Sequence, residues 1–394
     1  MKQVKLGDIF EIARGGSPRP INDFLTNDPD GINWVMIGDA TQGDKYITST
    51  KKKIRKNGAS RSRKVKPGDF LLTNSMSFGH PYIMKTDGCI HDGWLVLSKR
   101  SNEICEDYFY HLLGSPLLYH QFSAHAAGAT VKNLNIGIVE KIEISLPPLD
   151  EQKRIAAMLD KADAIRRKRA KALRLTDQFL QSVLLNMFGD PVTNSKKWSE
   201  SRLDEVADIA SGVTKGRRFN GRKTVLVPYM RVASVQDGYL RTDIITEIEV
   251  LPEDVERYRL QPGDVLLTEG GDPDKLGRGA VWRGEIETCI HQNHIFRVRP
   301  QESLLDSDYL SALIGSRRGK AYFAKAAKQT TGIASINMTQ LKAFPALVPP
   351  LSLQSQFADL VSKNRELTAR LQDAASVADA LFTSITQRAF QGTL

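Results

Sequence analysis

The amino-acid sequence predicts an α+β protein in which two similar domains are separated by two long helices that pack antiparallel as a coiled coil. Three observations support this fold class. The chain has 394 residues, more than the roughly 250–300 at which a single hydrophobic core stops growing. Segments recur about 200 residues apart, in the same order. Each copy then ends in a long stretch with apolar residues at helical spacing. The repeat is therefore expected to have pseudo-two-fold character.

Matching segments carry the repeat. The segment PGDFLLT at 67–73 recurs as PGDVLLT at 262–268, an offset of 195. Cys-Ile-His at 89–91 recurs at 289–291, an offset of 200. Because the offset drifts slowly, the extra residues of the second copy are expected in loops, chiefly between these two segments. A period this long indicates duplicated domains rather than a solenoid.

Within each copy the order of predicted elements is the same. Alternating segments such as WVMI and YMRV, with Pro-Gly-Asp turn signals, predict strand-rich domains. A helical pattern follows each domain after a Pro-Pro pair. The predicted organisation is a first domain over 1–149, a long helix over 150–190, a second domain over 191–351 and a second long helix over 352–394.

The two helical patterns predict how the helices pack. Asp150 is a candidate N-cap of the first helix. In the second, the apolar seam is expected at Phe357, Leu360, Leu367, Leu371, Ala374, Val377, Leu381, Ile385 and Ala389, with a polar interruption at Asn364. A helix of about 38 residues is roughly 57 Å long and cannot bury such a stripe alone. An antiparallel pair is therefore expected; the alternative is that each helix packs on its own domain.

Composition indicates the kind of partner and compartment. The chain has 55 Lys and Arg against 45 Asp and Glu, a net charge of +10, which is typical of proteins that bind a polyanion. Cys89, Cys105 and Cys289 are too few and too scattered for a disulfide framework or a structural zinc site, which favours a cytoplasmic protein. No apolar run approaches the roughly 20 residues that span a bilayer, so no membrane partner is expected.

One segment is strongly basic. KKKIRKNGASRSRKVK at 51–66 has nine basic residues in sixteen and no acidic residue. Lys and Arg that neutralise phosphates supply most of the sequence-independent affinity for DNA, and Asn57, Ser60 and Ser62 add hydrogen-bond donors. The segment predicts a phosphate-binding loop; the alternative is a solvated turn between strands.

Catalytic signatures are not found in the sequence. The glycine-rich loops lack P-loop spacing, and the residues before the Pro-Pro pairs, Leu146 and Val348, differ from those of amino-methyltransferases. Cys89 with His91, and Cys289 with His291 and His294, give fewer ligands than the four that structural zinc needs. No catalytic residue and no metal ligand is therefore predicted, and these histidines are interpreted as part of half-buried strands.

Two matched segments carry a resemblance to a known family. PPLDEQ at 147–152, with Ile155, is paralleled by PPLSLQ at 349–354, with Phe357. Together with the two PGD-LLT strands they resemble the specificity (S) subunit of type I restriction–modification systems, over essentially the whole chain. The second copy departs from the first where Leu353 stands at the position of Glu151, so its helix start is expected to be capped differently.

The resemblance implies a function. Residues 1–149 and 191–351 would be target-recognition domains that each read one half of a bipartite double-stranded DNA target. The helices would hold the halves at a fixed spacing and bind two modification (methyltransferase) subunits, and restriction/motor subunits would join the full complex. The chain would then be no enzyme and bind no cofactor, with S-adenosylmethionine expected on the modification subunit.

Residues that contact DNA are expected on loops. Arg suits guanine O6 and N7, and Asn or Gln suits adenine N6 and N7. The glycine-rich entry loops, the segments after the LLT strands, the basic segment and a late Gly-Thr loop give the DNA-binding candidates Arg14, Ser17, Arg19, Lys51, Lys52, Lys53, Arg55, Lys56, Arg61, Arg63, Lys64, Asn74, Ser75, Thr130, Lys132, Lys215, Arg217, Arg218, Lys275, Arg278, Thr331 and Ser335.

Two other classes of protein remain open at this point. One is a self-sufficient DNA methyltransferase or nuclease with fused recognition domains, which would need S-adenosylmethionine or metal motifs. The other is a coiled-coil scaffold that does not bind DNA, against which the basic composition of 51–66 argues.

Overall fold

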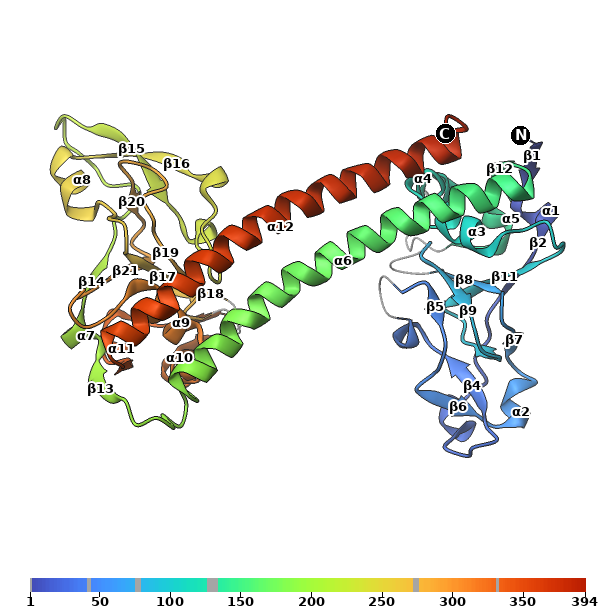
Figure 1. Ribbon diagram of the computed structural model, residues 1–394, viewed down its shortest axis with the longest axis horizontal. Helices are drawn as coiled ribbons and strands as arrows, with labels where there is room; N and C mark the ends of the chain where they lie inside the picture. The colour runs from blue at the N-terminus through green and yellow to red at the C-terminus, as the bar shows by residue number, and fades with distance from the viewer. Residues whose placement is uncertain (1, 41–43, 75–78, 126–133, 272–275, 331–332) are drawn as a thin grey trace. The chain divides into compact units, whose positions relative to one another are not determined.

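A computed structural model of the chain describes residues 2–40, 44–74, 79–125, 134–271, 276–330 and 333–394 (Figure 1). The chain divides into two compact units. The first unit comprises Met1–Lys171 with Asp373–Leu394, and the second comprises Ala172–Gln372. Each unit therefore contains one mixed domain and a part of both long helices. Across the described residues, no helix is long and apolar enough to cross a membrane.

The first domain contains short strands and helices. Its strands are β1 (Lys2–Lys5), β2 (Phe10–Arg14), β3 (Leu25–Thr26), β4 (Ile32–Val35), β5 (Tyr46–Ile47), β6 (Lys52–Ile54), β7 (Arg63–Val65), β8 (Phe70–Thr73), β9 (Pro81–Met84), β10 (Gly88–Ile90), β11 (Trp94–Lys99) and β12 (Glu143–Leu146). Its helices are α1 (Leu6–Ile9), α2 (Lys56–Ala59), α3 (Glu106–Leu113), α4 (Pro116–His125) and α5 (Ile136–Lys141).

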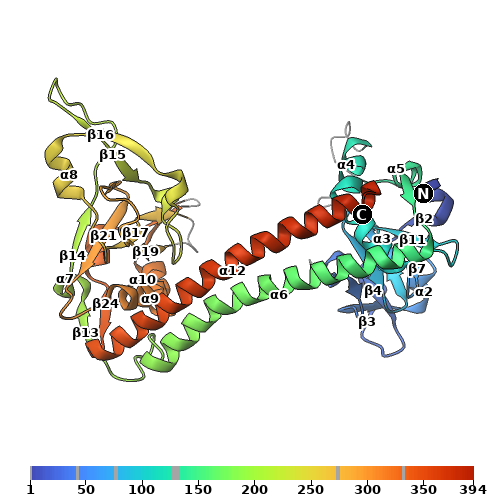
Figure 2. The same cartoon turned by 45° about the horizontal axis from the view of Figure 1, so that its top comes forward.

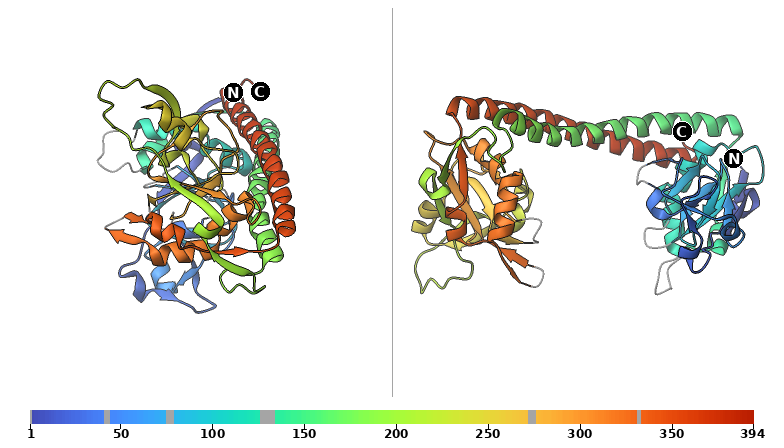
Figure 3. Two further views of the ribbon diagram at one scale, coloured as in Figure 1. Left: turned by 90° about the vertical axis from the view of Figure 1, so that its left-hand side faces the viewer. Right: turned by 90° about the horizontal axis from the view of Figure 1, so that it is seen from below.

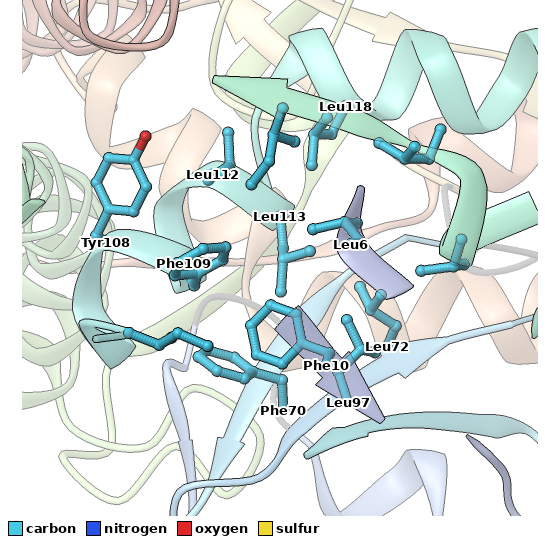
Figure 4. Packing of buried hydrophobic residues seen from close by; sticks show 14 of the residues in the cluster. Leu6, Phe10, Phe70, Leu72, Leu97, Tyr108, Phe109, Leu112, Leu113 and Leu118 are labelled. Carbon is cyan, nitrogen blue, oxygen red and sulfur yellow. The ribbon is translucent and has the colours of Figure 1, made fainter. Parts of the chain in front are cut away.

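Two five-stranded sheets organise this domain. One has the order β2-β11-β8-β9-β5, and the other has the order β3-β6-β4-β10-β7. The face of the first sheet packs on α3, where the rings of Phe10 and Phe109 meet edge to face at 5.1 Å (Figure 4). In the second sheet β4 and β10 run parallel. Their carboxyl ends therefore lie at the same sheet edge, which is where the candidate site begins.

The second domain repeats the central strands of this plan in sheets of four and three strands. Its strands are β13 (Ser199–Arg202), β14 (Ala207–Ser211), β15 (Val225–Met230), β16 (Thr246–Val250), β17 (Val265–Thr268), β18 (Gly270–Gly271), β19 (Gly279–Val281), β20 (Ile290–His291), β21 (Ile295–Pro300), β22 (Lys328–Thr330), β23 (Ile333–Ser335) and β24 (Pro345–Val348). Its helices are α7 (Leu203–Val206), α8 (Pro252–Tyr258), α9 (Ser307–Gly315), α10 (Arg317–Ala326) and α11 (Met338–Lys342).

Sheet order and register confirm the duplication. The order β14-β21-β17-β19 matches β2-β11-β8-β9, and the parallel pair β15 and β20 matches β4 and β10. Figure 2 shows the strands β14, β21, β17 and β19 of the second domain. In the first domain Leu97 pairs with Ile12 and Phe70. In the second, Val298 pairs with Ile209 and Val265. Equivalent residues of β11 and β21 are thus 201 positions apart.

The recurrence of Cys-Ile-His is displaced from this structural match by one residue. Ile90 pairs with Val35, whereas His291 pairs with Met230. Val35 and Met230 are equivalent residues of the two copies, at the offset of 195. His291 therefore occupies the place of Ile90 rather than that of His91. Because neighbouring strand residues point to opposite faces, the two histidines lie in different surroundings. His291 is fully buried, and His91 is partly exposed.

A buried histidine at this place makes the second unit sensitive to acid. Burial lowers the pKa of His291 to about 4, so the folded chain favours the neutral ring. The contribution of this neutral ring to the free energy of unfolding is fully present above about pH 6.5, the pKa of a histidine in the unfolded chain. It is lost as the pH falls toward 4, and about 2 kcal/mol of it is lost at pH 5. Replacing His291→Ile, as in the first domain, is expected to remove this loss. Hydrogen exchange of Ile295–Pro300 at pH 7 and pH 5, corrected for intrinsic rates, measures it; equal losses in both proteins would contradict it.

The two long helices are α6 (Leu149–Phe188) and α12 (Leu351–Gln391), and they pack antiparallel within each unit (Figures 1 and 3). In the first unit the Arg166 guanidinium lies over the Phe382 ring at 4.7 Å. In the second unit the Phe188 and Phe357 rings meet at 5.6 Å. The contact that lies later on α6 is made with a residue that lies earlier on α12, as an antiparallel pair requires. The first turns of each helix pack on the domain that precedes that helix. The predicted antiparallel pair and the alternative, packing of each helix on its own domain, therefore both occur.

The seam of α12 differs from the predicted one. Residues that face inward step by four and three through Phe357, Val361, Asn364, Thr368, Leu371, Ala375, Ala378, Phe382, Ile385 and Ala389. The predicted seam residues Leu367, Val377 and Leu381 are instead 51%, 68% and 51% exposed. The seam prediction was wrong at these positions because the next residue along the chain, Thr368, Ala378 or Phe382, faces inward instead. An apolar residue at helical spacing was taken as buried.

A buried glutamine attaches each long helix to its domain. Gln152 donates from Nε2 to the Glu103 and Pro147 carbonyls, at 3.1 and 3.0 Å, and its Oε1 accepts from the Cys105 N–H at 3.0 Å. Gln354 makes the equivalent three bonds to Leu304, Pro349 and Asp306. α6 begins at Leu149, so Asp150, predicted as the N-cap, lies within the first turn. The glutamine therefore explains why both copies carry Pro-Pro-Leu-x-x-Gln.

Removing this glutamine is expected to destabilise one unit. Gln152→Leu preserves much of the volume but removes the side-chain partner of three backbone groups that are buried or partly buried, at roughly 1–3 kcal/mol for a fully orphaned group. We expect the unfolding free energy of the first unit to fall by about 3 kcal/mol in urea titrations, and Gln354→Leu to do the same for the second. Gln387→Leu, at an exposed position of α12 within the first unit, is the control and should change the unfolding free energy of that unit by less than about 0.5 kcal/mol. Equal stability of Gln152→Leu and the control would contradict the attachment.

Candidate nucleic-acid interface

The basic segment 51–66 is regular structure rather than the predicted loop. It forms β6, the short helix α2 and β7. β6 pairs with β4 on one side of the sheet, and β7 pairs with β10 on the other. The hydrophobic residues Ile54, Ala59 and Val65 are buried and attach the segment to the domain. The basic side chains are thereby held on a fixed backbone.

Most of these basic side chains face solvent without an acidic partner. Eight of the nine are exposed, and Lys53 is partly buried. Within the described part of the chain none of the nine forms a salt bridge. Lys51 and Lys53 donate to the Gly38 and Pro29 carbonyls, and Arg61 lies 5.4 Å from the Phe24 ring centroid. Cations without counter-charges on a rigid support are suited to bind phosphates.

The serine hydroxyls of this segment have internal partners. The Ser60 hydroxyl donates to the Asn57 carbonyl at 2.8 Å, and the Ser62 hydroxyl donates to the Ile90 carbonyl at 3.1 Å. Both stabilise the backbone around α2 and the neighbouring strand. They are therefore not free donors for phosphate in this structure, in contrast to the expectation from sequence.

Four predicted residues converge on one aspartate that the sequence did not single out. The Asp92 carbonyl accepts from Arg14 Nε at 3.2 Å and from Asn74 Nδ2 at 2.8 Å. Its Oδ1 accepts from the Ser17 hydroxyl at 2.8 Å, and its Oδ2 lies 3.8 Å from Arg19 Nη2. The hydrogen bond from Ser17 is the main cause that lowers the pKa of Asp92. The carboxylate is therefore charged at neutral pH.

A pocket of about 450 Å³ opens beside Asp92. Its lining brings together the predicted residues Ser17, Arg19 and Lys52 with Trp34, Met36 and His91. Asp92 is its one acidic residue, counted over the described residues. The entry loop, the ends of β4 and β10 and the start of β6 thus meet here. The position directly after Cys-Ile-His was the signal that could have indicated Asp92.

His91 holds the wall of this pocket as a neutral ring. The Gly93 N–H points to Nδ1 at 2.8 Å, and the Ile37 N–H points to Nε2 at 3.1 Å. Burial lowers the pKa of His91, and two facing N–H groups further disfavour an imidazolium. At the equivalent place of the second domain, Gln292 Oε1 accepts from the Val232 N–H at 3.4 Å. In both domains, therefore, a polar side chain accepts a hydrogen bond from the backbone just after β4 or its equivalent β15.

Asn74 must be corrected as a DNA-binding candidate. Its side chain is only 2% exposed, and its amide donates to the Asp92 carbonyl. Its own carbonyl accepts from the Leu134 N–H at 2.8 Å. Asn74 therefore positions the site rather than reaching a base. The predicted residues Ser75, Thr130, Lys132, Lys275 and Thr331 lie outside the described residues.

The candidates of the second domain are more dispersed. Lys215 and Arg218 are exposed, whereas Arg217 pairs with Asp254 at 2.8 Å. Arg278 donates from Nη1 to Gln236 Oε1 at 2.8 Å, and Ser335, in β23, is partly buried. Arg217 is thus neutralised by a carboxylate. Among the predicted candidates that the structure describes in this domain, Lys215, Arg218 and Arg278 are the cations without a carboxylate partner.

The long helices expose the same three apolar positions in each copy. Ile165, Leu175 and Phe179 of α6 are about half exposed. The residues 202 positions later on α12 are Leu367, Val377 and Leu381, which are also exposed. Ile165 with Val377 and Leu381 belongs to the first unit, and Leu367 with Leu175 and Phe179 belongs to the second. We call these two sets the helix patches. Contiguous exposed apolar surface is typical of protein interfaces, and these repeated positions are therefore candidates for one.

Comparison with known proteins identifies the class of this fold and site. The family model described as "Type I restriction modification DNA specificity domain" matches residues 1–175 and 195–374. The chain therefore belongs to this family, and the resemblance noted in the sequence is confirmed. A self-sufficient methyltransferase or nuclease is not favoured by these matches.

Particular relatives agree with this assignment. The chain is 24% identical over 389 residues to the type I restriction enzyme StySPI specificity subunit of Salmonella potsdam, covering 91% of this chain and 82% of the relative. It is 23% identical to the EcoKI specificity subunit of Escherichia coli K12, covering 90% and 80%.

Solved structures show the same fold. A chain described under complex assembly and conformational transition of the type I R-M system matches with a TM-score of 0.60 and 19% identity, covering 100% of this chain and 98% of that one. The S subunit from M. genitalium matches with a TM-score of 0.56 and 14% identity, covering 99% and 96%.

Proposed function

We propose that this chain reads a bipartite double-stranded DNA target, one half with each domain, and carries two modification (methyltransferase) subunits on its helices. The observation that carries the proposal is the duplication itself. Both domains repeat one sheet plan, and both helices expose the same three apolar positions. Two copies of a recognition domain and two copies of a docking patch suit two half-sites and two partner subunits.

DNA contact in the first domain is assigned to cations of the basic segment and of the entry loop. The candidates are Lys51, Lys52, Lys53, Arg55, Lys56, Arg61, Arg63 and Lys64, with Arg14 and Arg19 of the entry loop. The strand–helix–strand support fixes their positions, and phosphate contacts of this kind set the register of a protein on a duplex. In the second domain we assign the same role to Lys215, Arg218 and Arg278. The domains are taken as 1–149 and 191–351, with the long helices over 150–190 and 352–394.

The helix patches are assigned to the modification subunits. Each patch consists of three large apolar side chains that are about half exposed or more. Burial of such side chains against a partner removes apolar surface from water, at roughly 25 cal/mol per Å². Because the patches repeat, one kind of partner occupies both. Restriction/motor subunits are then part of the complete complex.

Catalysis and cofactor binding are assigned to the partners. The chain would contribute no catalytic residue and no cofactor, and S-adenosylmethionine would be held by the modification subunit. The three cysteines are free thiols, which suits a cytoplasmic complex that acts on DNA.

Methylome sequencing tests this function. A host without other methyltransferases would express the chain with its modification subunit. We expect methylation at one sequence made of two specified halves separated by unspecified bases, and no methylation from either protein alone. Methylation at a continuous motif, or by this chain alone, would refute the proposal.

A further inference from the structure

We infer that Asp92 determines part of the specificity of the first domain, by accepting a hydrogen bond from an exocyclic amino group of a base. The inference rests on the proposed function. In the major groove such amino groups are cytosine N4 and adenine N6, and both match a carboxylate acceptor. The inference adds a residue and a base chemistry to a domain whose DNA contact is otherwise assigned to cations.

The charge around Asp92 makes a carboxylate unusual at this place. The pocket also contains Arg19 and Lys52, and the adjoining basic segment has no acidic residue. A carboxylate that approaches DNA is repelled by phosphates, so its presence disfavours binding unless a base supplies a donor. The Asp92 side chain is 48% exposed and thus accessible to a ligand. A requirement for one base pair follows from this penalty.

The carboxylate is held in place with one oxygen left available. Arg14 and Asn74 hold the backbone carbonyl, and the Ser17 hydroxyl occupies Oδ1. Among the described residues, the salt bridge of Oδ2 is with Arg19 Nη2, at 3.8 Å, and that arginine side chain is 84% exposed. A surface ion pair at this distance contributes little stability. Oδ2 can therefore exchange Arg19 for a base without disturbing the three contacts that position the residue.

The second domain presents different chemistry at the equivalent position. The strand register places Asn293 where the first domain has Asp92. Asparagine offers a donor and an acceptor, whereas a carboxylate only accepts. The two domains are therefore built to read different bases here. The duplication also supplies a natural substitution, Asp92→Asn, in which the amide oxygen can still accept from Ser17.

The test measures base discrimination by the complex of this chain with its modification subunit. Binding is compared across duplexes that carry each base pair at every specified position of the methylome-derived target. For Asp92→Asn we expect discrimination to fall by roughly ten- to a hundredfold at one position of one half-site. That position should be read as cytosine or adenine by the unsubstituted chain, and the panel distinguishes the two. Asp87→Asn, which removes an exposed carboxylate near β10, is the control and should change nothing.

Each outcome decides the inference. Unchanged discrimination for Asp92→Asn, with the wild-type target intact, overturns it and leaves the proposed function standing. The absence of any bipartite target for the unsubstituted chain refutes the proposed function instead. If Asp92→Asn fails to fold, Asp92→Glu keeps the charge but displaces it by one methylene, and a loss of discrimination at one position still supports the inference. If neither variant folds, Asp92 has a structural role and the inference fails.

Discussion

Reversing two charges in the basic segment, Lys52→Glu with Arg63→Glu, is expected to weaken binding to every duplex by a similar factor. Both side chains are exposed and have no salt bridge within the described residues. Phosphate contacts carry no sequence information, so all sequences should be affected alike. Removing one phosphate interaction should flatten the slope of log K against log salt by roughly one, and removing both should flatten it by about two.

Salt titrations on random and target duplexes measure this effect. The control reverses Lys2 and Lys141, two exposed lysines of β1 and α5 outside the basic segment. An equal decrease in the control would mean that net charge alone matters. A decrease confined to one position of one half-site would mean that the basic segment reads bases, contrary to its assignment to phosphate.

Replacing the apolar residues of one helix patch is expected to halve the number of bound modification subunits. Val377→Asp with Leu381→Asp places two charges where the proposed interface is desolvated. Interface anchors of this kind contribute about 2 kcal/mol or more each, which is roughly thirtyfold in affinity. Both residues are more than half exposed in the chain alone, so its unfolding free energy should change by less than about 0.5 kcal/mol.

Native mass spectrometry of the reconstituted complex counts the subunits. We expect two per wild-type chain, one for the Val377 and Leu381 variant, and none when Leu175→Asp and Phe179→Asp are added. Ser376→Asp with Gln387→Asp, at exposed polar positions of α12, is the control and should retain two. Two subunits bound to the quadruple variant would exclude the helix patches as docking surfaces.

The architecture could be read from the sequence to a large extent. Two copies of PGD-LLT and of Pro-Pro-Leu-x-x-Gln predicted duplicated domains and paired helices, and the structure has both. The seam could not be read as well. Leu367, Val377 and Leu381 are apolar and helically spaced, yet they face solvent while Asn364 and Thr368 face inward. Apolar character shows that a residue avoids water, but not whether its own chain or another covers it.

The site was predictable only in its charges. The basic residues of 51–66 are adjacent in the sequence, so their composition was sufficient to indicate a polyanion. Asp92 is distant from Arg14 and Ser17 along the chain, and strand pairing between β2 and β11 brings them together. The offset of 200 for Cys-Ile-His also suggested that His91 and His291 are equivalent. Only the register of the strands shows that they are not.

That one-residue displacement determines where segments of the two copies can be recombined. A chimaera joined at Cys-Ile-His, where the residues are identical, would lack one residue before β11, or gain one before β21 if the copies are joined in the other order. Either change turns the neighbouring strand residues to the wrong face of the sheet. A crossover within Pro-Gly-Asp, or at the start of α3 and α9, would keep the strands in phase. Recombination guided by sequence identity alone would thus fail at one of the segments in which the two copies are identical. Productive exchange between the copies is restricted to crossover points at which the strand ladders coincide.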